Sequence, residues 1–507
     1  MTFNRHIRCA IALMLATGAA SAQPADPLRM SVEQAVNSNP EVTARFNAYR
    51  ASVDAVDVAR AGFLPRLDLN ANVGRDSDRI STRNPETQNL NRREAGLTLT
   101  QLLWDGMGTK NDVTRAGHDR LARYFELLDV TEQTALEAAR AHFDVQRYRR
   151  LVQLAEDNYV QHRYAYLQIQ SRYKAGVGRG VDLEQAGARV ALAESNLTTE
   201  VANLHDVTAR YQRIVGVAPP KSLPVISMLK SALPATQAEA MTAAVRQSAA
   251  VSASIEGLRA ARASVDGRKS VYQPRIDARL RGSAGHNVDA IADRTRDTAA
   301  EIVLSWNLYN GGADQARVRQ QTNLLSQSAD LRDKTCRDTR QTTAIAYNDT
   351  RKLVDQLIYL DRNTLAIEKA RDAYRQQFDI GQRSLLDLLN AENELYTARR
   401  AYANAEYDLG FAYARTHAAM YQLGSQLGVS RVDNVANDAS GWEQGDDAPT
   451  RCPVIVAETT STDHSELDAR AQKLAESAPP VPPARPAPAG QTAPLLPSQP
   501  ASGPAKK

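Results

Sequence analysis

The chain repeats part of its own sequence about two hundred residues further on, and this duplication limits its possible folds more than any other feature. The segments Leu97-Thr98-Leu99 and Leu103-Trp104-Asp105-Gly106 recur as Ile302-Val303-Leu304 and Leu308-Tyr309-Asn310-Gly311, at a constant offset (302 − 97 = 205). Further upstream, Pro65-Arg66 recurs as Pro274-Arg275 at a slightly larger offset (274 − 65 = 209). A duplication of this length indicates two copies of one structural unit.

The first 22 residues have the pattern of a secretory signal peptide. Arg5 and Arg8 precede the apolar run Ile11 to Ala16, and Ala20-Ser21-Ala22 forms a small-residue cleavage site. We therefore expect an exported protein. After cleavage two cysteines remain, Cys336 and Cys452. One pair is not a disulfide framework, so we expect two free thiols without a role.

The composition and the absence of catalytic motifs exclude several classes of function. The 62 basic and 58 acidic residues give a net charge of +4, which provides no electrostatic reason to expect nucleic acid. No apolar run of about 18 residues follows the signal, so no membrane-spanning helix is predicted. None of the patterns H-E-x-x-H, G-x-x-x-x-G-K-S/T or G-x-S-x-G occurs. We expect neither an enzyme nor a site for a cofactor or metal.

Four segments alternate between apolar and polar residues. Leu67, Leu69 and Val73 are separated by polar residues, and the duplicate segment repeats the pattern. Because side chains two apart share a strand face, each segment has one apolar and one polar face. The predicted strands lie at about 65–75, 95–105, 274–283 and 299–310. Two interpretations remain open: a soluble sheet with one wet face, or membrane strands from several copies, since open edges in lipid leave backbone groups unpaired.

Two segments are long enough to predict coiled-coil helices. Residues 118–175 and 313–380 contain neither Gly nor Pro, and they predict rods of roughly 85 to 100 Å. The segment that follows the second rod has a heptad seam from Leu388 through Leu395 and Tyr402 to Leu409. Each repeat is therefore predicted as a short helix, a strand hairpin, a long helix, a tight turn and a second short helix. In the first repeat, the short helices lie at about 31–62 and 182–214.

These features together resemble the TolC family of outer-membrane efflux and secretion channels. The resemblance covers about residues 28–428, and its most specific segment runs from Gly381 to Arg399. It implies a mainly α fold with a membrane β-barrel part. Long coiled-coil helices form a helical barrel, and four strands per protomer join a trimeric, 12-stranded transmembrane β-barrel.

The same resemblance implies a location and a set of partners. The channel lies in the outer membrane of a Gram-negative bacterium, contacts outer-membrane lipid and extends into the periplasm. Its expected partners are two further copies of itself, a periplasmic adaptor (membrane fusion) protein and an inner-membrane ABC or proton-driven transporter, with no nucleic acid. The tip segment looks most like the branch for type I protein secretion. The alternatives are a drug or small-molecule efflux duct of the same family and, from another class, a periplasmic coiled-coil structural protein.

The resemblance places a gate at the periplasmic tip. Arg383 matches the family's linking arginine, Asp387 its ring carboxylate, and Asp182 the acidic partner on the first turn. At two positions the chain departs from the family: Phe378 has no hydroxyl where a tyrosine is usual, and Asn390 replaces a second carboxylate.

Local chemistry offers a simpler role for the two acidic residues. Ser384 followed by Asp387 is nearly a capping box, and Asp182 is a plausible N-cap.

Two further groups of residues follow from the same resemblance. The expected adaptor contacts are Gly176, Val177, Gly381 and Gln382, although the two glycines could simply supply positive φ angles in turns. The expected membrane-interface aromatics are Trp104, Trp306 and Tyr309, for which ordinary packing is the alternative.

The duplication also divides the chain. We assign 23–218 to the first repeat, 219–235 to a linker and 236–428 to the second repeat. Residues 429–507 form a Pro/Ala-rich extension that we expect to be disordered from about residue 478.

Overall fold

The computed structural model describes residues 26–221, 228–230, 233–290, 292–429, 452–456 and 463–477. The predicted signal peptide, the tail from residue 478 and part of the linker lie outside these residues. The chain divides into two units, one up to Val456 and one from Ala457, and the second contains the helix α11 (His464–Ser477).

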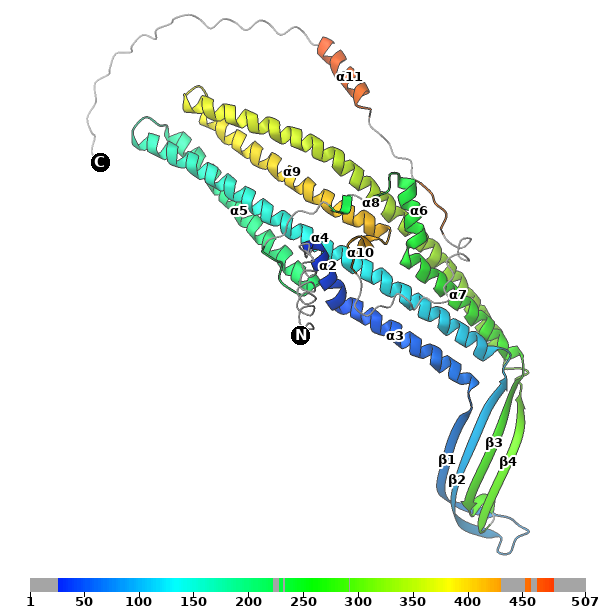
Figure 1. The fold of residues 1–507 in the computed structure, drawn as a ribbon. Coiled ribbons are helices and arrows are strands. Elements are labelled where there is room, and N and C mark those ends of the chain that lie inside the picture. Colours follow the sequence, from blue (N-terminus) through cyan, green and yellow to red (C-terminus); the bar gives the residue numbers. More distant parts are fainter. Residues whose placement is uncertain are drawn as a thin grey trace, which may run out of the picture. The chain divides into compact units, whose positions relative to one another are not determined.

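The two repeats share one order of elements, and the second repeat has η4 and α10 in addition (Figure 1). The first repeat consists of α2 (Pro27–Ser38), α3 (Pro40–Arg60), η1 (Ala61–Phe63), β1 (Arg66–Arg79), β2 (Thr87–Trp104), α4 (Gly108–Lys174) and α5 (Gly180–Val215). The short η2 (Met228–Lys230) lies between the repeats. The second repeat consists of α6 (Gln237–Gln247), α7 (Ala249–Lys269), η3 (Ser270–Tyr272), β3 (Arg275–His286), η4 (Val288–Ala290), β4 (Arg294–Ser305), α8 (Ala313–Asp379), α9 (Leu385–Ala419) and α10 (Leu423–Gln426).

The helix predicted at 31–62 is two helices that meet at Asn39. The Asn39 side chain accepts a hydrogen bond from the Glu41 N–H at 2.9 Å, and Pro40 starts α3. Proline suits this first helical position, where its missing N–H has no partner to lose. Ser248 occupies the same place in the second repeat and caps α7 through the Val251 N–H.

The long helices α4 and α8 each have 67 residues, which corresponds to about 100 Å. The prediction for the first rod began too late, because α4 continues through Gly117 to Gly108. α5 and α9 return along these rods as antiparallel hairpins (Figure 1). The largest apolar core lies where α2, α4, α5, α9 and α10 meet, and it is rich in alanine. None of the described helices combines the length and the apolar character that crossing a membrane requires.

The four strands form one antiparallel sheet in the order β1-β2-β3-β4. Leu67 pairs with Leu99, and Leu99 pairs with Leu280, so one face is apolar. The neighbouring row contains Asp68 and Arg281, on the polar face. The predicted alternation is therefore confirmed, but β4 ends at Ser305 and not at residue 310.

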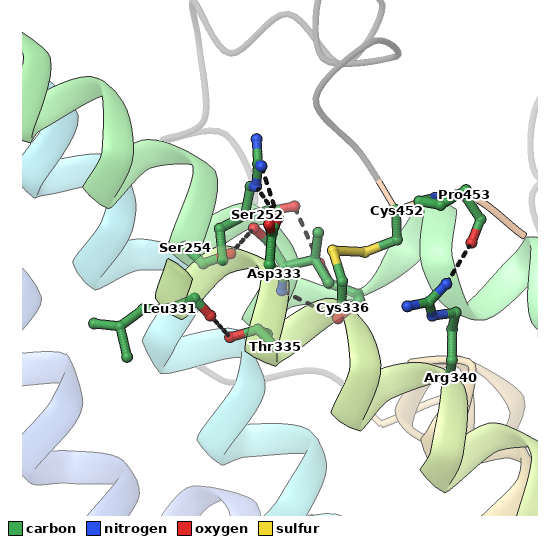
Figure 2. Close-up of a disulfide and its surroundings, with 12 residues drawn as sticks. Ser252, Ser254, Leu331, Asp333, Thr335, Cys336, Arg340, Cys452 and Pro453 are labelled. Atoms are coloured by element: carbon green, nitrogen blue, oxygen red, sulfur yellow. Dashed lines mark hydrogen bonds and ion pairs between the residues drawn. A yellow bond between two sulfur atoms is a disulfide. The ribbon is translucent and has the colours of Figure 1, made fainter. Parts of the chain in front are cut away.

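The expectation of two free thiols is wrong. Cys336 of α8 and Cys452 form a disulfide with a Cα–Cα distance of 5.4 Å (Figure 2). Part of the extension is thus covalently joined to the second repeat. The available signal was an exported chain that retains two cysteines, because disulfides persist in oxidising compartments.

Candidate functional site

The two helical hairpins end in turns of the same geometry, at the end of the helical part opposite the strands (Figure 1). Gly176 and Gly381 have φ angles of 74° and 76°, and a Cβ at either position would meet nothing within 4 Å. Both turns close the preceding helix by hydrogen bonds, from the Val177 N–H to the Arg172 carbonyl and from the Gln382 N–H to the Gln377 carbonyl. The glycines therefore supply the left-handed conformation that the turns require.

Both turns also expose their tips. Val177 is 79% exposed, and Gln382 is exposed as well. Ile380 beside Gly381 is 69% exposed. The tips thus present apolar side chains to the surroundings of the single chain.

The capping interpretation of Ser384 and Asp387 is confirmed. The Ser384 hydroxyl accepts a hydrogen bond from the Asp387 N–H at 3.3 Å and donates one to the Asp387 carboxylate at 2.8 Å. Arg383 lies 3.7 Å from the same carboxylate, donates to the Gln377 side chain at 3.0 Å and stacks over the Tyr374 ring at 4.6 Å. Within one chain, these three contacts of Arg383 are all to its own hairpin.

Asp182 does not cap α5, contrary to the alternative derived from the sequence. The cap position is Arg179, which makes no side-chain cap, and Asp182 lies in the first helical turn. Its side chain is half-buried. A carboxylate there is favourable because it lies near the positive end of the helix dipole.

Phe378 and Asn390 each form a link between the two hairpins. Phe378 is 6% exposed, and the Arg172 guanidinium of the other hairpin lies 5.2 Å from its ring centroid. Asn390 accepts a hydrogen bond at 2.8 Å from Arg189 of α5. Between these links lies a small core to which all four helices contribute, formed by Ala165, Ile169, Ala186, Phe378, Leu385, Leu388 and Leu389.

A second layer of links was not found from the sequence. Arg375 donates hydrogen bonds at 2.6 Å both to Gln161 of α4 and to Glu392 of α9. Arg371 reaches the same carboxylate at 3.4 Å, and the Glu392 side chain is only 8% exposed. The available signal was the i,i+4 spacing of two arginines beside an apolar seam.

Burial also changes the protonation of a histidine on the first hairpin. The His162 side chain is buried, and burial lowers its pKa to about 4, with a smaller contribution from Arg189. His162 is therefore neutral near pH 7.

The aromatic residues near the strand ends lie in different environments. Trp104 ends β2 and is half-buried. Trp306 and Tyr309 follow the end of β4 and are 52% and 84% exposed. On the polar face of the sheet, Arg279 lies 3.6 Å from Glu301, which is the cross-strand pairing expected of opposite charges.

Comparison with known proteins gives consistent results. A family model described as "Outer membrane efflux protein" matches residues 31–216 and 240–420. Outer membrane efflux protein BepC of Brucella suis is 26% identical over 395 residues, which cover 76% of this chain and 84% of that protein. Outer membrane protein TolC of Escherichia coli is 23% identical over 439 residues, covering 81% and 85%.

The alkaline protease secretion protein AprF of Pseudomonas aeruginosa is 23% identical over 448 residues, which cover 85% of this chain and 92% of that protein. Among solved structures, the outer-membrane channel OprN has a TM-score of 0.70 at 20% identity, covering 79% of this chain and 91% of that chain. The fold of the described chain is therefore that of these channels.

Proposed function

Since the chain belongs to the outer membrane efflux protein family, we propose that it is the outer-membrane duct of a three-part export machinery. It is a transport channel and not an enzyme, and it lies in the outer membrane and extends into the periplasm. In this proposal, a periplasmic adaptor and an inner-membrane transporter pass cargo into the duct. Membership in the family leaves no support for the alternative of a structural coiled coil.

The duct we propose is a homotrimer, and the open edges of the sheet carry this proposal. β1 and β4 are edge strands, and within the described part of one chain nothing pairs with their outer sides. In lipid an unpaired strand edge is strongly unfavourable. Three copies supply twelve strands, and a barrel of that size encloses a lumen.

The duplication predicts how neighbouring copies pair. Inside one chain, Leu97 of β2 lies opposite Gly282 of β3. The offsets of 205 and 209 transfer this pair to Ile302 of one copy and Val73 of the next (97 + 205 = 302, 282 − 209 = 73).

A pair of equivalent glycines supports the same interface. A Cβ on Gly106 would lie 2.8 Å from the Ser270 carbonyl oxygen of η3, whereas one on Gly311 would meet nothing within 4 Å. The equivalent of η3 in the first repeat is η1, whose Phe63 is 47% exposed. In the trimer, η1 of the next copy covers Gly311.

Cross-linking tests the trimer and its register together. In a chain with cysteines at Ile302 and Val73, oxidation should give covalent trimers in membranes. The control pairs Ile302→Cys with Asn72→Cys, whose side chain faces the other side of the sheet, and should give few. A link within one chain is excluded, because β1 and β4 are three strand spacings apart, about 14 Å. Only monomers after oxidation, together with a monomer mass by light scattering in detergent, would refute the proposal.

For the cargo we propose protein export of the type I kind, supported by the similarity to AprF over most of both chains. Small-molecule efflux is the second candidate, supported by the similarity to the efflux protein BepC. Deletion of the gene separates them. Loss of a secreted protein from the culture medium with unchanged drug susceptibility supports the first, and the reverse result supports the second.

At the tip, we propose that Asp387, Asn390, Arg383, Asp182 and Phe378 form the periplasmic gate, with Gly176, Val177, Gly381 and Gln382 contacting the adaptor. The support is the position of both turns at the end of the helical part and their exposed apolar side chains. In this arrangement Arg383 and Asp182 meet across neighbouring copies, because neither is linked to the other within one chain. Trp104, Trp306 and Tyr309 contact lipid headgroups at the periplasmic side of the membrane.

A further inference from the structure

The disulfide joins a short piece of the C-terminal extension to α8, where Cys452 enters an apolar cluster formed by α6, α7 and α8. Cys452 is 6% exposed and packs in one apolar cluster with Met241, Val245, Val251, Ile255 and Cys336. Arg340 of α8 donates a hydrogen bond to the Pro453 carbonyl at 3.4 Å (Figure 2). The two cysteines are 116 residues apart in the sequence. The extension follows α10 along the chain, and the disulfide attaches it to α8 as well.

The duplication relates this apolar cluster to a core of the first repeat. Met241 and Val245 of α6 correspond to Val32 and Val36 of α2, at the offset of 209. In the first repeat these valines belong to a core that includes Leu423 and Leu427, at the two ends of α10. Among the described residues α10 has no second copy, and its leucines pack in the core of the first repeat. In the second repeat, Cys452 packs against Met241 and Val245 instead, and residues 453–456 that follow it are exposed.

The burial of both sulfurs restricts when the bond can form or break. Cys336 and Cys452 are each 6% exposed. Thiol–disulfide exchange requires that a thiolate reach a sulfur atom. A soluble oxidant or reductant therefore reaches these sulfurs only before the segment has docked.

We propose that the Cys336–Cys452 bond is an assembly latch, formed once in the periplasm, that holds Cys452 in the apolar cluster of α6, α7 and α8 and keeps Pro453 beside Arg340. The oxidant is a dithiol–disulfide protein of the periplasm. The two thiols of this chain lose two protons and two electrons and form the S–S bond, and the disulfide of the oxidant is reduced to a dithiol. The bond is not a switch that cycles in the folded channel.

Thiol labelling of the full-length channel in detergent tests this latch without a variant. In the native wild-type channel, dithiothreitol should release no thiols that react with a maleimide. After denaturation, labelling should require dithiothreitol. Rapid release of both thiols in the native channel would show a cycling redox site, and labelling of the denatured chain without a reductant would show that the bond is absent. Either result overturns the proposal.

A single variant tests whether the bond holds the segment in place. In Cys452→Ser the segment from residue 452 to 456 should leave the apolar cluster. Cys336 should then react with the maleimide at a rate close to that of a cysteine on an exposed position of α8. The matched control is Asp333→Cys in the Cys336→Ser/Cys452→Ser background, because the Asp333 side chain is 56% exposed. If Cys336 still reacts at least about a hundredfold more slowly than the control, the segment stays in the apolar cluster without the bond. That result overturns the proposal of a latch.

Discussion

Arg375 should hold the two hairpins of each protomer together near the gate, and its replacement should open the resting channel. The same guanidinium nitrogen donates to Gln161 of one hairpin and to Glu392 of the other, both at 2.6 Å. Arg375→Met keeps most of the side-chain volume and removes both hydrogen bonds. Arg371 still neutralises Glu392, so the variant loses mainly the link between the hairpins.

The size of the effect follows from that link. A hydrogen bond that involves a charged group contributes about 1.5 to 3 kcal/mol. The Arg375 side chain is 36% exposed, so solvent screening favours a value of about 1 to 1.5 kcal/mol. Since 1.4 kcal/mol is a factor of ten in an equilibrium constant, the open population of each protomer should rise about fivefold to tenfold. Planar-bilayer recordings should show this as a higher resting conductance.

Arg399→Met is the matched control. Arg399 pairs with Glu368, and both residues belong to the hairpin of α8 and α9, so the variant removes an ion pair without unlinking the hairpins. Both side chains are more than a third exposed, and such pairs contribute about 0 to 1 kcal/mol. The reasoning is refuted if Arg375→Met conducts like wild type, or if both variants raise the conductance equally.

Three further predictions concern the gate, the pH dependence and the tail. Asp387→Ala should reduce cation preference and weaken the block by multivalent cations, because three carboxylates near one axis attract cations. The control Ser384→Ala loses the same cap and should only lower stability by about 0.5 to 2 kcal/mol. Equal ion selectivity in Asp387→Ala and wild type would show that Asp387 is not part of the gate. Burial raises the pKa of Glu132 to about 7, so the folded chain keeps a proton that the unfolded chain loses above about pH 4.5, and stability should fall as pH rises towards 7 by up to about 1.4 kcal/mol per unit. Glu132→Gln should flatten this dependence in thermal unfolding, and an unchanged slope would contradict the raised pKa. Truncation after Val456 should leave trimers intact, since the removed composition cannot form a core; their loss at normal expression would place the tail in the folded body.

The features that were predicted correctly depend on neighbouring residues or on the duplication. A helix seam, a strand alternation and a glycine turn each follow from residues a few positions apart, whose geometry is the same in every fold. The capping of Asp387 by Ser384 is of this kind. Because of the duplication, each of these patterns occurs twice in the sequence, and the repeated order of elements made the family recognisable.

The sequence by itself determined the elements, their order and the two faces of each strand, because these follow from local periodicity. Only the tertiary structure decided which side chains from distant parts of the sequence meet. Arg189 and Asn390 are 201 positions apart, Gln161 and Arg375 are 214 apart, and the two cysteines are 116 apart. Which of many arginines reaches a given partner depends on how one hairpin is rotated and shifted against the other. Packing between the helices sets that rotation and shift, and the sequence of a single helix does not determine them.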